Sequence, residues 1–391
     1  MEKRFVYADN AATTPVYPEV LEAMMPAFGE VYGNPSSLYS KGNEAKAVLN
    51  ASREKIADIL GCKPSEFFFT SCGTESDNWA IKGAARANVS RGKHLVTTKI
   101  EHHAVLHTMK ALEKEGFEVT YVAPNSDGII TPESIKEALR PDTTLVSVMY
   151  ANNEIGTIEP IKEIAEVVKA YDSKIVVFTD AVQALGNVKI NLHELGVDML
   201  SLSGHKIHAP KGIGGLYIKT GTRVHTFVDG GGQERNRRGG TENLAYIAGL
   251  AKAIELADKN LCDIPRIEKM RDRLVKGIVE KIPYVRVNGT MENRLPGNIN
   301  VAFEYIEGES MLLLLDMAGI CSSTGSACSS NSLEPSHVLL SIGVPVEVAH
   351  GSLRLSLGRD NTEEDVDYIL DVLPTVVQRL RDMSPIYPGN K

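Results

Sequence analysis

The chain has 391 residues, and 42 lysines and arginines against 50 aspartates and glutamates give it a formal net charge of −8. This acidic balance argues against a nucleic-acid-binding protein, because contact with phosphates favours a basic surface. With 43% hydrophobic and 24% charged residues, the composition excludes the disordered and fibrous classes and is typical of a globular protein.

The first half of the chain has the pattern of an α/β domain. From about residue 64 to 220, short β-branched or apolar runs alternate with helical patterns, which is typical of βαβ units and a largely parallel sheet. The expected strands are Phe67–Thr70, His94–Thr98, Val119–Val122, Leu145–Tyr150, Ile175–Thr179, Met199–Ser203 and Gly215–Ile218. Pro132–Leu139 and Pro160–Tyr171 read as helices that begin with proline. We therefore predict a doubly wound sheet that binds ligands at the carboxyl ends of its strands.

The last third of the chain has a different rhythm and predicts a second, smaller α+β domain. A helix is expected from 242 to 260 after the glycine-rich stretch Gly230–Gly240. Further strands are expected at Val285–Val287, Asn298–Val301 and Leu353–Leu357, and further helices near 265–281, 308–318 and 362–382. A chain of this length exceeds the roughly 250 to 300 residues at which single cores stop growing. We place the large domain at 15–260 and the small domain at 1–14 together with 261–391.

Neither a membrane-spanning segment nor disulfide bonds are expected. The longest apolar run, Met311–Leu315, ends at Asp316, so we predict no membrane segment. An odd, sparse set of cysteines without a secretory signal predicts reduced thiols and a cytoplasmic location. The cysteines are Cys62, Cys72, Cys262, Cys321 and Cys328. No metal site is expected, since no CxxC pair or histidine cluster completes a ligand set.

Two segments after expected strands carry polar residues suited to a phosphate and a cofactor. In FFFTSCGTESDN, the amides of Gly73 and Thr74 could bind an anion at a helix N-terminus, although an ordinary βα turn uses similar residues. Asp180 follows an apolar strand, where it either faces the ligand crevice or serves as a helix cap or turn residue. Lys206, in Ser203–Lys206, is either a surface lysine or a cofactor-binding amine. Lysine, carboxylate and anion site together are what a pyridoxal phosphate enzyme needs.

Three further residues are candidates for chemistry. Cys328 lies in CSSTGSACSSNS, a stretch dense in small polar residues, which favours a reactive thiol over a buried structural one. One histidine of the His102–His103 pair, which follows a strand, could stack on a flat ring or move protons, unless the pair is simply polar surface. Arg354 alternates with Leu353 and Leu355, so it points to the opposite face, where a substrate carboxylate or an internal salt bridge would pair with it.

An ordered series of motifs resembles the cysteine desulfurases of the NifS/IscS type through almost the whole chain. The motifs are ADNAATTP, GNPSS from Gly33, GTESDN from Gly73, NNEIG from Asn152, SGHKIHAPKGIG from Ser203, RRGGTEN from Arg237, TGSACSS from Thr324 and LRLSLGR from Leu353. The resemblance implies the aspartate-aminotransferase-like fold of pyridoxal 5′-phosphate enzymes (fold type I), with a mainly parallel large domain and a smaller α+β domain. It also implies a homodimer with the active site at the subunit boundary.

The resemblance assigns roles position by position. Lys206 is then the lysine that forms the Schiff base, Asp180 pairs with the pyridine nitrogen, and Cys328 is the nucleophile. The other expected cofactor contacts are His102 stacked on the ring, Gln183 at the phenolic oxygen, Gly73, Thr74, Ser203 and His205 around the phosphate, and Thr241 from the other subunit. The substrate carboxylate is expected at Asn152 and Arg354.

The activity implied by this resemblance is conversion of L-cysteine to L-alanine. Cys328 would carry the sulfur as a persulfide and donate it to an acceptor or scaffold protein for iron–sulfur cluster assembly. An aminotransferase or a selenocysteine lyase of the same fold is the nearest alternative, but a transaminase needs no thiol. A non-catalytic sulfur-transfer scaffold is another, and a thiol hydrolase would leave Lys206 and Asp180 unexplained.

Overall fold

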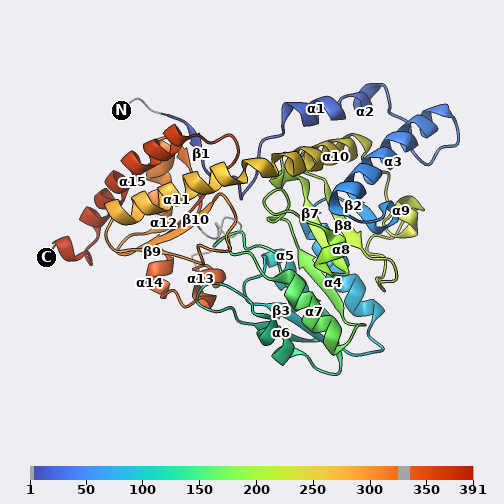
Figure 1. Cartoon of the computed structure of the whole chain (residues 1–391), viewed down its shortest axis with the longest axis horizontal. Coiled ribbons are helices and arrows are strands. Elements are labelled where there is room, and N and C mark those ends of the chain that lie inside the picture. The colour runs from blue at the N-terminus through green and yellow to red at the C-terminus, as the bar shows by residue number, and fades with distance from the viewer. Residues whose placement is uncertain (1–3, 325–334, 391) are drawn as a thin grey trace.

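A seven-stranded sheet forms the centre of the larger part of the molecule (Figure 1). The computed structural model describes residues 4–324 and 335–390. Across the sheet the strands are β2 (Phe67–Thr70), β8 (Gly214–Ile218), β7 (Met199–Ser203), β6 (Val176–Asp180), β5 (Thr143–Ser147), β3 (His94–Thr98) and β4 (Glu118–Val122). Strand β8 is antiparallel to both neighbours, whereas β7, β6, β5, β3 and β4 are mutually parallel. The predicted α/β class is confirmed.

Helices cover both faces of this sheet because its strands are apolar on both sides. Phe68 packs with α4 (Gly73–Ala87) and α5 (His103–Lys114) on one face. Phe67 and Phe69 contribute to the core on the other face, which includes α7 (Ile161–Tyr171) and α10 (Leu244–Lys259). Outside α10 lie α1 (Pro18–Met24), α2 (Pro26–Gly29) and α3 (Ser40–Leu60). The remaining short helices of this part are α6 (Pro132–Ala138), α8 (Leu192–Leu195) and α9 (Gln233–Asn236).

The smaller part is built on an antiparallel sheet in the order β12 (Ser352–Ser356), β10 (Asn298–Phe303) and β9 (Val285–Val287). Its helices are α11 (Ile264–Lys281), α12 (Gly308–Met317), α13 (His337–Ser341), α14 (Val346–Ala349) and α15 (Glu363–Met383). A separate parallel pair joins β1 (Val6–Tyr7) to β11 (Ile320–Cys321). The N-terminal segment thus pairs with the C-terminal third of the chain, beside α15 in Figure 1.

The hydrophobic clusters show how the two parts are joined. Val6 and Ala8 pack in the core of the smaller part with α11 and α15. Val338 and Leu339 of α13, in contrast, pack in the core of the larger part. The domain boundaries expected from the sequence remain a prediction, and the 338–349 region is where the packing departs from them. No helix within residues 4–324 and 335–390 has the length and apolarity needed to cross a membrane.

Candidate active site

A cavity of about 380 Å³ lies at the carboxyl ends of the parallel strands. The segments after β2, β3, β5, β6 and β7 contribute to its wall, and Arg354 of β12 contributes from the smaller part. Predicted site residues in the wall are Gly73, Thr74, His102, Asp180, Gln183, Ser203, His205, Lys206 and Arg354. Their common position follows from topology, because parallel strands bring their carboxyl ends to one edge of the sheet.

Lys206 and Asp180 lie on adjacent strand ends in this cavity. Lys206 closes the short 3-10 turn after β7, and its Nζ donates hydrogen bonds to the carbonyl oxygens of Ala11 (2.7 Å) and Ala12 (2.8 Å). Asp180 ends β6, and its Oδ1 accepts a hydrogen bond from the amide of Val182 at 2.9 Å. Burial raises the pKa of Asp180 to about 6, while that hydrogen bond and the charge of Lys206 act in the opposite direction. A buried carboxylate of this kind is suited to hold a cationic ring nitrogen.

The start of α4 provides a cradle for an anion. Gly73 and Thr74 occupy its first turn, where backbone amides have no acceptor within the helix. A Cβ added at Gly73 would lie 2.9 Å from Cγ2 of Val182 and 3.3 Å from Cβ of Ser203, so the backbone can approach this closely only as glycine. His205 lines the same cavity, and burial, with the charge of Lys206, lowers its pKa to about 4. The residues present fit a phosphate-bearing ring cofactor.

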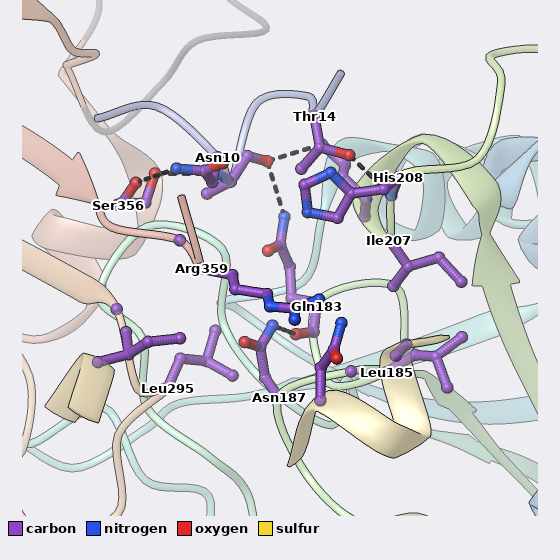
Figure 2. Close-up of a pocket in the computed structure, with 18 of the residues that line it drawn as sticks. Asn10, Thr14, Gln183, Leu185, Asn187, Ile207, His208, Leu295, Ser356 and Arg359 are labelled. Atoms are coloured by element: carbon purple, nitrogen blue, oxygen red, sulfur yellow. Dashed lines mark hydrogen bonds between the residues drawn. The ribbon is translucent and has the colours of Figure 1, made fainter. Parts of the chain in front are cut away.

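His102 and Gln183 frame the cavity on two sides. Nδ1 of His102 accepts the amide of Ala104 at 3.2 Å and so caps α5, and burial followed by the charge of Lys206 lowers its pKa to about 4. The ring is therefore neutral at physiological pH. The Gln183 amide donates to the carbonyl oxygen of Ala11 at 3.0 Å. Figure 2 shows this residue from a second, smaller cavity of about 110 Å³, which Gln183 and Lys206 also line.

Arg354 forms the internal ion pair, one of the two pairings that the sequence left open. It is 1% exposed; its Nη2 lies 2.9 Å from Oδ1 of Asp9, and its Nη1 donates to the carbonyl oxygen of Asn153 at 3.0 Å. The internal ion pair therefore exists. Arg354 nevertheless lines the cavity, and its Nε has no hydrogen-bond partner among the described residues. The N–H at Nε is thus not used by any described residue.

Asn152 is not placed to bind a substrate. Its side chain is fully buried, with Nδ2 donating to the carbonyl oxygen of Ile100 at 2.9 Å. Its Oδ1 accepts the amides of Glu154 at 2.8 Å and Ile155 at 3.0 Å. The amide group is thus fully engaged in holding the turn, and the neighbouring Asn153 lines the cavity instead. The NNEIG motif contains both Asn152 and Asn153, but its sequence alone does not indicate which of the two side chains faces the cavity.

Two other predicted residues are not found in the cavity wall: one lies elsewhere, and the other falls outside the described residues. Thr241 is exposed and lines a separate hollow of about 220 Å³ with Glu234 and Arg238. Within one chain it does not reach the cavity. Cys328 lies outside the described residues, but the segments on both sides of 325–334 hydrogen-bond to residues of the cavity wall. Ser323 pairs through its backbone with Arg354, at 2.6 and 3.1 Å. On the far side, the hydroxyl of Ser336 hydrogen-bonds to the carboxyl group of Glu154.

Three buried acids of the cavity wall had not been predicted, namely Asp77, Glu101 and Glu154. Oε1 of Glu101 accepts the hydroxyl of Thr98 at 2.9 Å and the amide of Met149 at 2.8 Å. Burial raises the pKa of Glu101 to about 8 and that of Glu154 to about 7. The sequence did not indicate these acids, because an acidic residue in a loop, such as Glu101 and Glu154, or in a helix, such as Asp77, normally reads as solvated surface.

The comparisons with known proteins agree on one family. A model of the family described as aminotransferase class-V matches residues 6–369. The chain is 56% identical over 388 residues to a protein of Methanosarcina thermophila named cysteine desulfurase IscS, covering 99% of this chain and 95% of that one. A protein of Clostridium botulinum with the same name is 55% identical, with coverage of 98% and 96%.

Solved structures show the same similarity. One named NifS-like protein superposes with a TM-score of 0.91 at 41% identity, covering 96% of this chain and 100% of its own. Another, named SspA in complex with cysteine, has a TM-score of 0.79 at 37% identity, covering 90% of this chain and 98% of its own.

Proposed function

Because the chain belongs to the class-V aminotransferase family and to the cysteine desulfurases within it, we propose that it binds pyridoxal 5′-phosphate and uses it to convert L-cysteine to L-alanine. The observation that carries this proposal is the meeting of Lys206, Asp180 and the start of α4 around one cavity. An amine, a buried carboxylate and an anion cradle are the three groups that this cofactor requires. When bound, the cofactor supplies an electron sink for the bonds at the substrate α-carbon.

The cofactor contacts follow from the cavity wall. Lys206 would hold the cofactor covalently, and Asp180 would keep a proton on its ring nitrogen. His102 would lie against the ring. Gln183 would donate to the phenolic oxygen through its side-chain amide, which in this structure donates to the carbonyl oxygen of Ala11. The phosphate would be held by the first turn of α4 with Ser203 and His205. The same lysine amine, once freed by the substrate, would take the proton from the α-carbon at its Nζ.

Arg354 would bind the substrate carboxylate. Its Nε faces no partner among the described residues, and its guanidinium is held by Asp9 and by the carbonyl of Asn153. We assign the second polar contact to Asn153 rather than Asn152, because only the former lines the cavity. A fixed arginine orients the planar carboxylate, which in turn sets where the β-carbon and sulfur lie.

Cys328 would take the sulfur. Its thiolate would attack the sulfur of the substrate, forming an S–S bond while the C–S bond breaks. The electron pair of the C–S bond would stay on the carbon side, and the β-carbon would take up a proton to become the methyl group of alanine. The resulting persulfide would be passed to an acceptor or scaffold protein for iron–sulfur cluster assembly. Supporting this role, the segments before and after 325–334 both end on residues of the cavity wall, namely Arg354 and Glu154.

We also propose a homodimer in which Thr241 of each chain completes the phosphate site of the other. Large apolar side chains are exposed on α1, on α2 and in the segment that leads to α3. They are Leu21, Met25, Phe28, Tyr32, Leu38 and Tyr39. An apolar surface of this kind is typical of a protein interface. Light scattering is expected to give twice the chain mass, and a monomer that retains full activity would contradict this assignment of Thr241.

Two variants separate the proposed roles. Cys328→Ala is expected to keep the visible absorption of the bound cofactor but to lose sulfide production from L-cysteine. Lys206→Ala is expected to lose both, since it removes the covalent anchor. Cys262→Ala, which changes an exposed free thiol, serves as the control and should turn over normally. Full sulfide production by Cys328→Ala would show that another group accepts the sulfur.

A further inference from the structure

His337 lines the active-site cavity but has no place in the reaction described above. It is the first residue of α13, and the preceding Ser336 fixes its position. The hydroxyl of Ser336 accepts the amides of Val338 at 3.1 Å and Leu339 at 3.2 Å, and also hydrogen-bonds to Glu154. This network anchors the start of α13, so the imidazole is held in the wall of the cavity.

The hydrogen bond made by His337 determines where its proton lies. Nε2 is 3.0 Å from the carbonyl oxygen of Glu101. A carbonyl oxygen can only accept, so Nε2 carries the hydrogen, and the neutral ring keeps its lone pair on Nδ1. Burial lowers the pKa of His337, and this hydrogen bond partly opposes the effect. At neutral pH the ring is therefore an uncharged proton acceptor.

The charged and titratable groups around His337 come mainly from α5 and from the loop before it. On α5, His103, His107 and Lys110 all lower the pKa of His337. From the loop, His102 interacts with it electrostatically. Glu154 lies on the other side, bonded to the residue before His337, and is itself largely protonated below its pKa of about 7. None of these neighbours fixes a positive charge on the ring.

A row of histidine rings connects His337 with the surface. The ring centroids of His337 and His103 are 4.9 Å apart, and those of His103 and His107 are 5.1 Å apart. His107 is exposed, whereas Nδ1 of His103 is buried and has no hydrogen-bond partner among the described residues. Three imidazoles in succession thus lead from the cavity wall to solvent.

The proposed reaction has a proton that needs such a group. L-cysteine arrives with an ammonium group, and its nitrogen must be neutral before it can replace Lys206 on the cofactor. We propose that Nδ1 of His337 accepts this ammonium proton and that His103 and His107 exchange it with solvent. An N–H bond of the substrate breaks, an N–H bond forms at Nδ1, and the electron pair stays on the substrate nitrogen. The return of the same proton to the alanine amine restores the neutral ring.

The inference rests on the proposed function and is tested by His337→Gln. The glutamine amide can still donate to the Glu101 carbonyl but cannot take up a proton as imidazole does. We expect kcat/KM for L-cysteine to fall about 100-fold at neutral pH, within the range typical of a lost acid–base group, while the cofactor spectrum stays unchanged. The loss should shrink as the pH rises, because more of the substrate amine then enters neutral. A merely structural defect would not be relieved in this way.

The matched control is His350→Gln, which changes an exposed histidine next to α14 and should leave kcat/KM unchanged. A second variant, His103→Gln, tests the row independently: its turnover should be slow in weak buffer and should increase with imidazole concentration. Unchanged kcat/KM in His337→Gln, or an equal loss at every pH, would overturn the inference. If the unmodified protein makes neither sulfide nor alanine, the proposed function fails instead.

Discussion

Asp180 is the residue whose charge the proposed cofactor depends on most. Burial raises its pKa to about 6, so the carboxylate is ionised at neutral pH and becomes protonated as the pH falls through that value. Only the ionised form can hold a proton on the ring nitrogen. The affinity of the cofactor-free protein for pyridoxal 5′-phosphate should therefore weaken below pH 6, by up to about tenfold per pH unit.

Titration of cofactor binding at pH 7.5 and pH 5, followed by absorbance, measures this effect. Asp180→Asn is expected to bind weakly at both pH values, because its amide cannot ionise. Equal affinity of the wild-type protein at both pH values, together with tight binding by the asparagine variant, would show that Asp180 does not hold the ring nitrogen.

The orientation of single side chains could be predicted within a strand but not within a turn. Arg354 could be assigned to the face opposite Leu353 and Leu355 because a strand alternates strictly, and the structure confirms this placement. Asn152 and Asn153 lie in a turn, where no period says which side chain faces inward. The orientation of Asn152 is set by its hydrogen bond to the carbonyl oxygen of Ile100, which is distant in the sequence. A single sequence does not show such a contact.

The first turn of α4 is the element most sensitive to a small change. A methyl group at Gly73 would come 2.9 Å from Cγ2 of Val182, which follows β6 and lies next to Asp180's hydrogen bond. Gly73→Ala is therefore expected to weaken cofactor binding by about tenfold or more, because one displaced contact in a packed site costs on the order of 1–3 kcal/mol. Equilibrium titration with pyridoxal 5′-phosphate measures the change.

Gly29→Ala is the matched control for that variant. Gly29 also lies in a helix, but nothing stands within 4 Å of a Cβ added there, so cofactor affinity should not change. Equal affinities of the two alanine variants would indicate that the close approach of α4 to Val182 does not shape the phosphate site.

Element by element, the strands were predictable from short apolar or β-branched runs. All seven strands of the large sheet were expected within two or three residues. Six of them are buried along their whole length, where strands covered on both faces form largely apolar runs, and the partly buried β4 keeps its β-branched residues. Helix α3 was not predicted: its buried face mixes Gly42, Ser52 and Arg53 with apolar residues, which obscures the helical period. The turn at Glu234 to Asn236 was not predictable either.

That turn contains three successive non-glycine residues with positive φ angles of 44°, 59° and 62°. Such backbone is strained and persists only where contacts hold it. Arg53 supplies these contacts through a bidentate ion pair with Glu234, whose two hydrogen bonds measure 2.6 and 2.9 Å. Both side chains are buried. The restraint comes from far away in the chain and is absent from the local sequence.

For the whole molecule, the buried acids of the cavity predict how stability varies with pH. The folded-state pKa values of Glu154 (about 7) and Glu101 (about 8) lie above the ordinary glutamate value, so the folded protein binds protons that the unfolded chain does not. Their contribution is present at low pH and is lost as the pH rises through these values. His102 and His205, with pKa values lowered to about 4, have the opposite effect, but only below about pH 6.5.

Between pH 6.5 and pH 8 the acids therefore dominate. The free energy of unfolding of the cofactor-free protein is expected to fall by roughly 2 kcal/mol across this interval. Urea denaturation at the two pH values measures it, and Glu101→Gln should remove about two thirds of the difference. Stability that rises with pH in this interval would mean that the cavity carboxyl groups are ionised in the folded protein.

The class of the molecule could be predicted more fully than its assembly. The α/β fold, the family and the desulfurase relationship are confirmed, because an ordered series of motifs extends over nearly the whole chain. The partner subunit, the sulfur acceptor and the cytoplasmic location stay predictions. The first two depend on contacts with other chains, for example at the exposed apolar side chains around α1 and α2, and the sequence of one chain does not describe such contacts.

The most direct measurement of the central claim is the product balance of the purified, cofactor-loaded protein with L-cysteine and a thiol reductant. The account predicts a yellow protein that forms sulfide and L-alanine in equal amounts, with both products abolished in Cys328→Ala. A yellow protein that yields neither product, or that forms alanine without sulfide, would contradict the desulfurase mechanism and point to a different reaction at the same cavity.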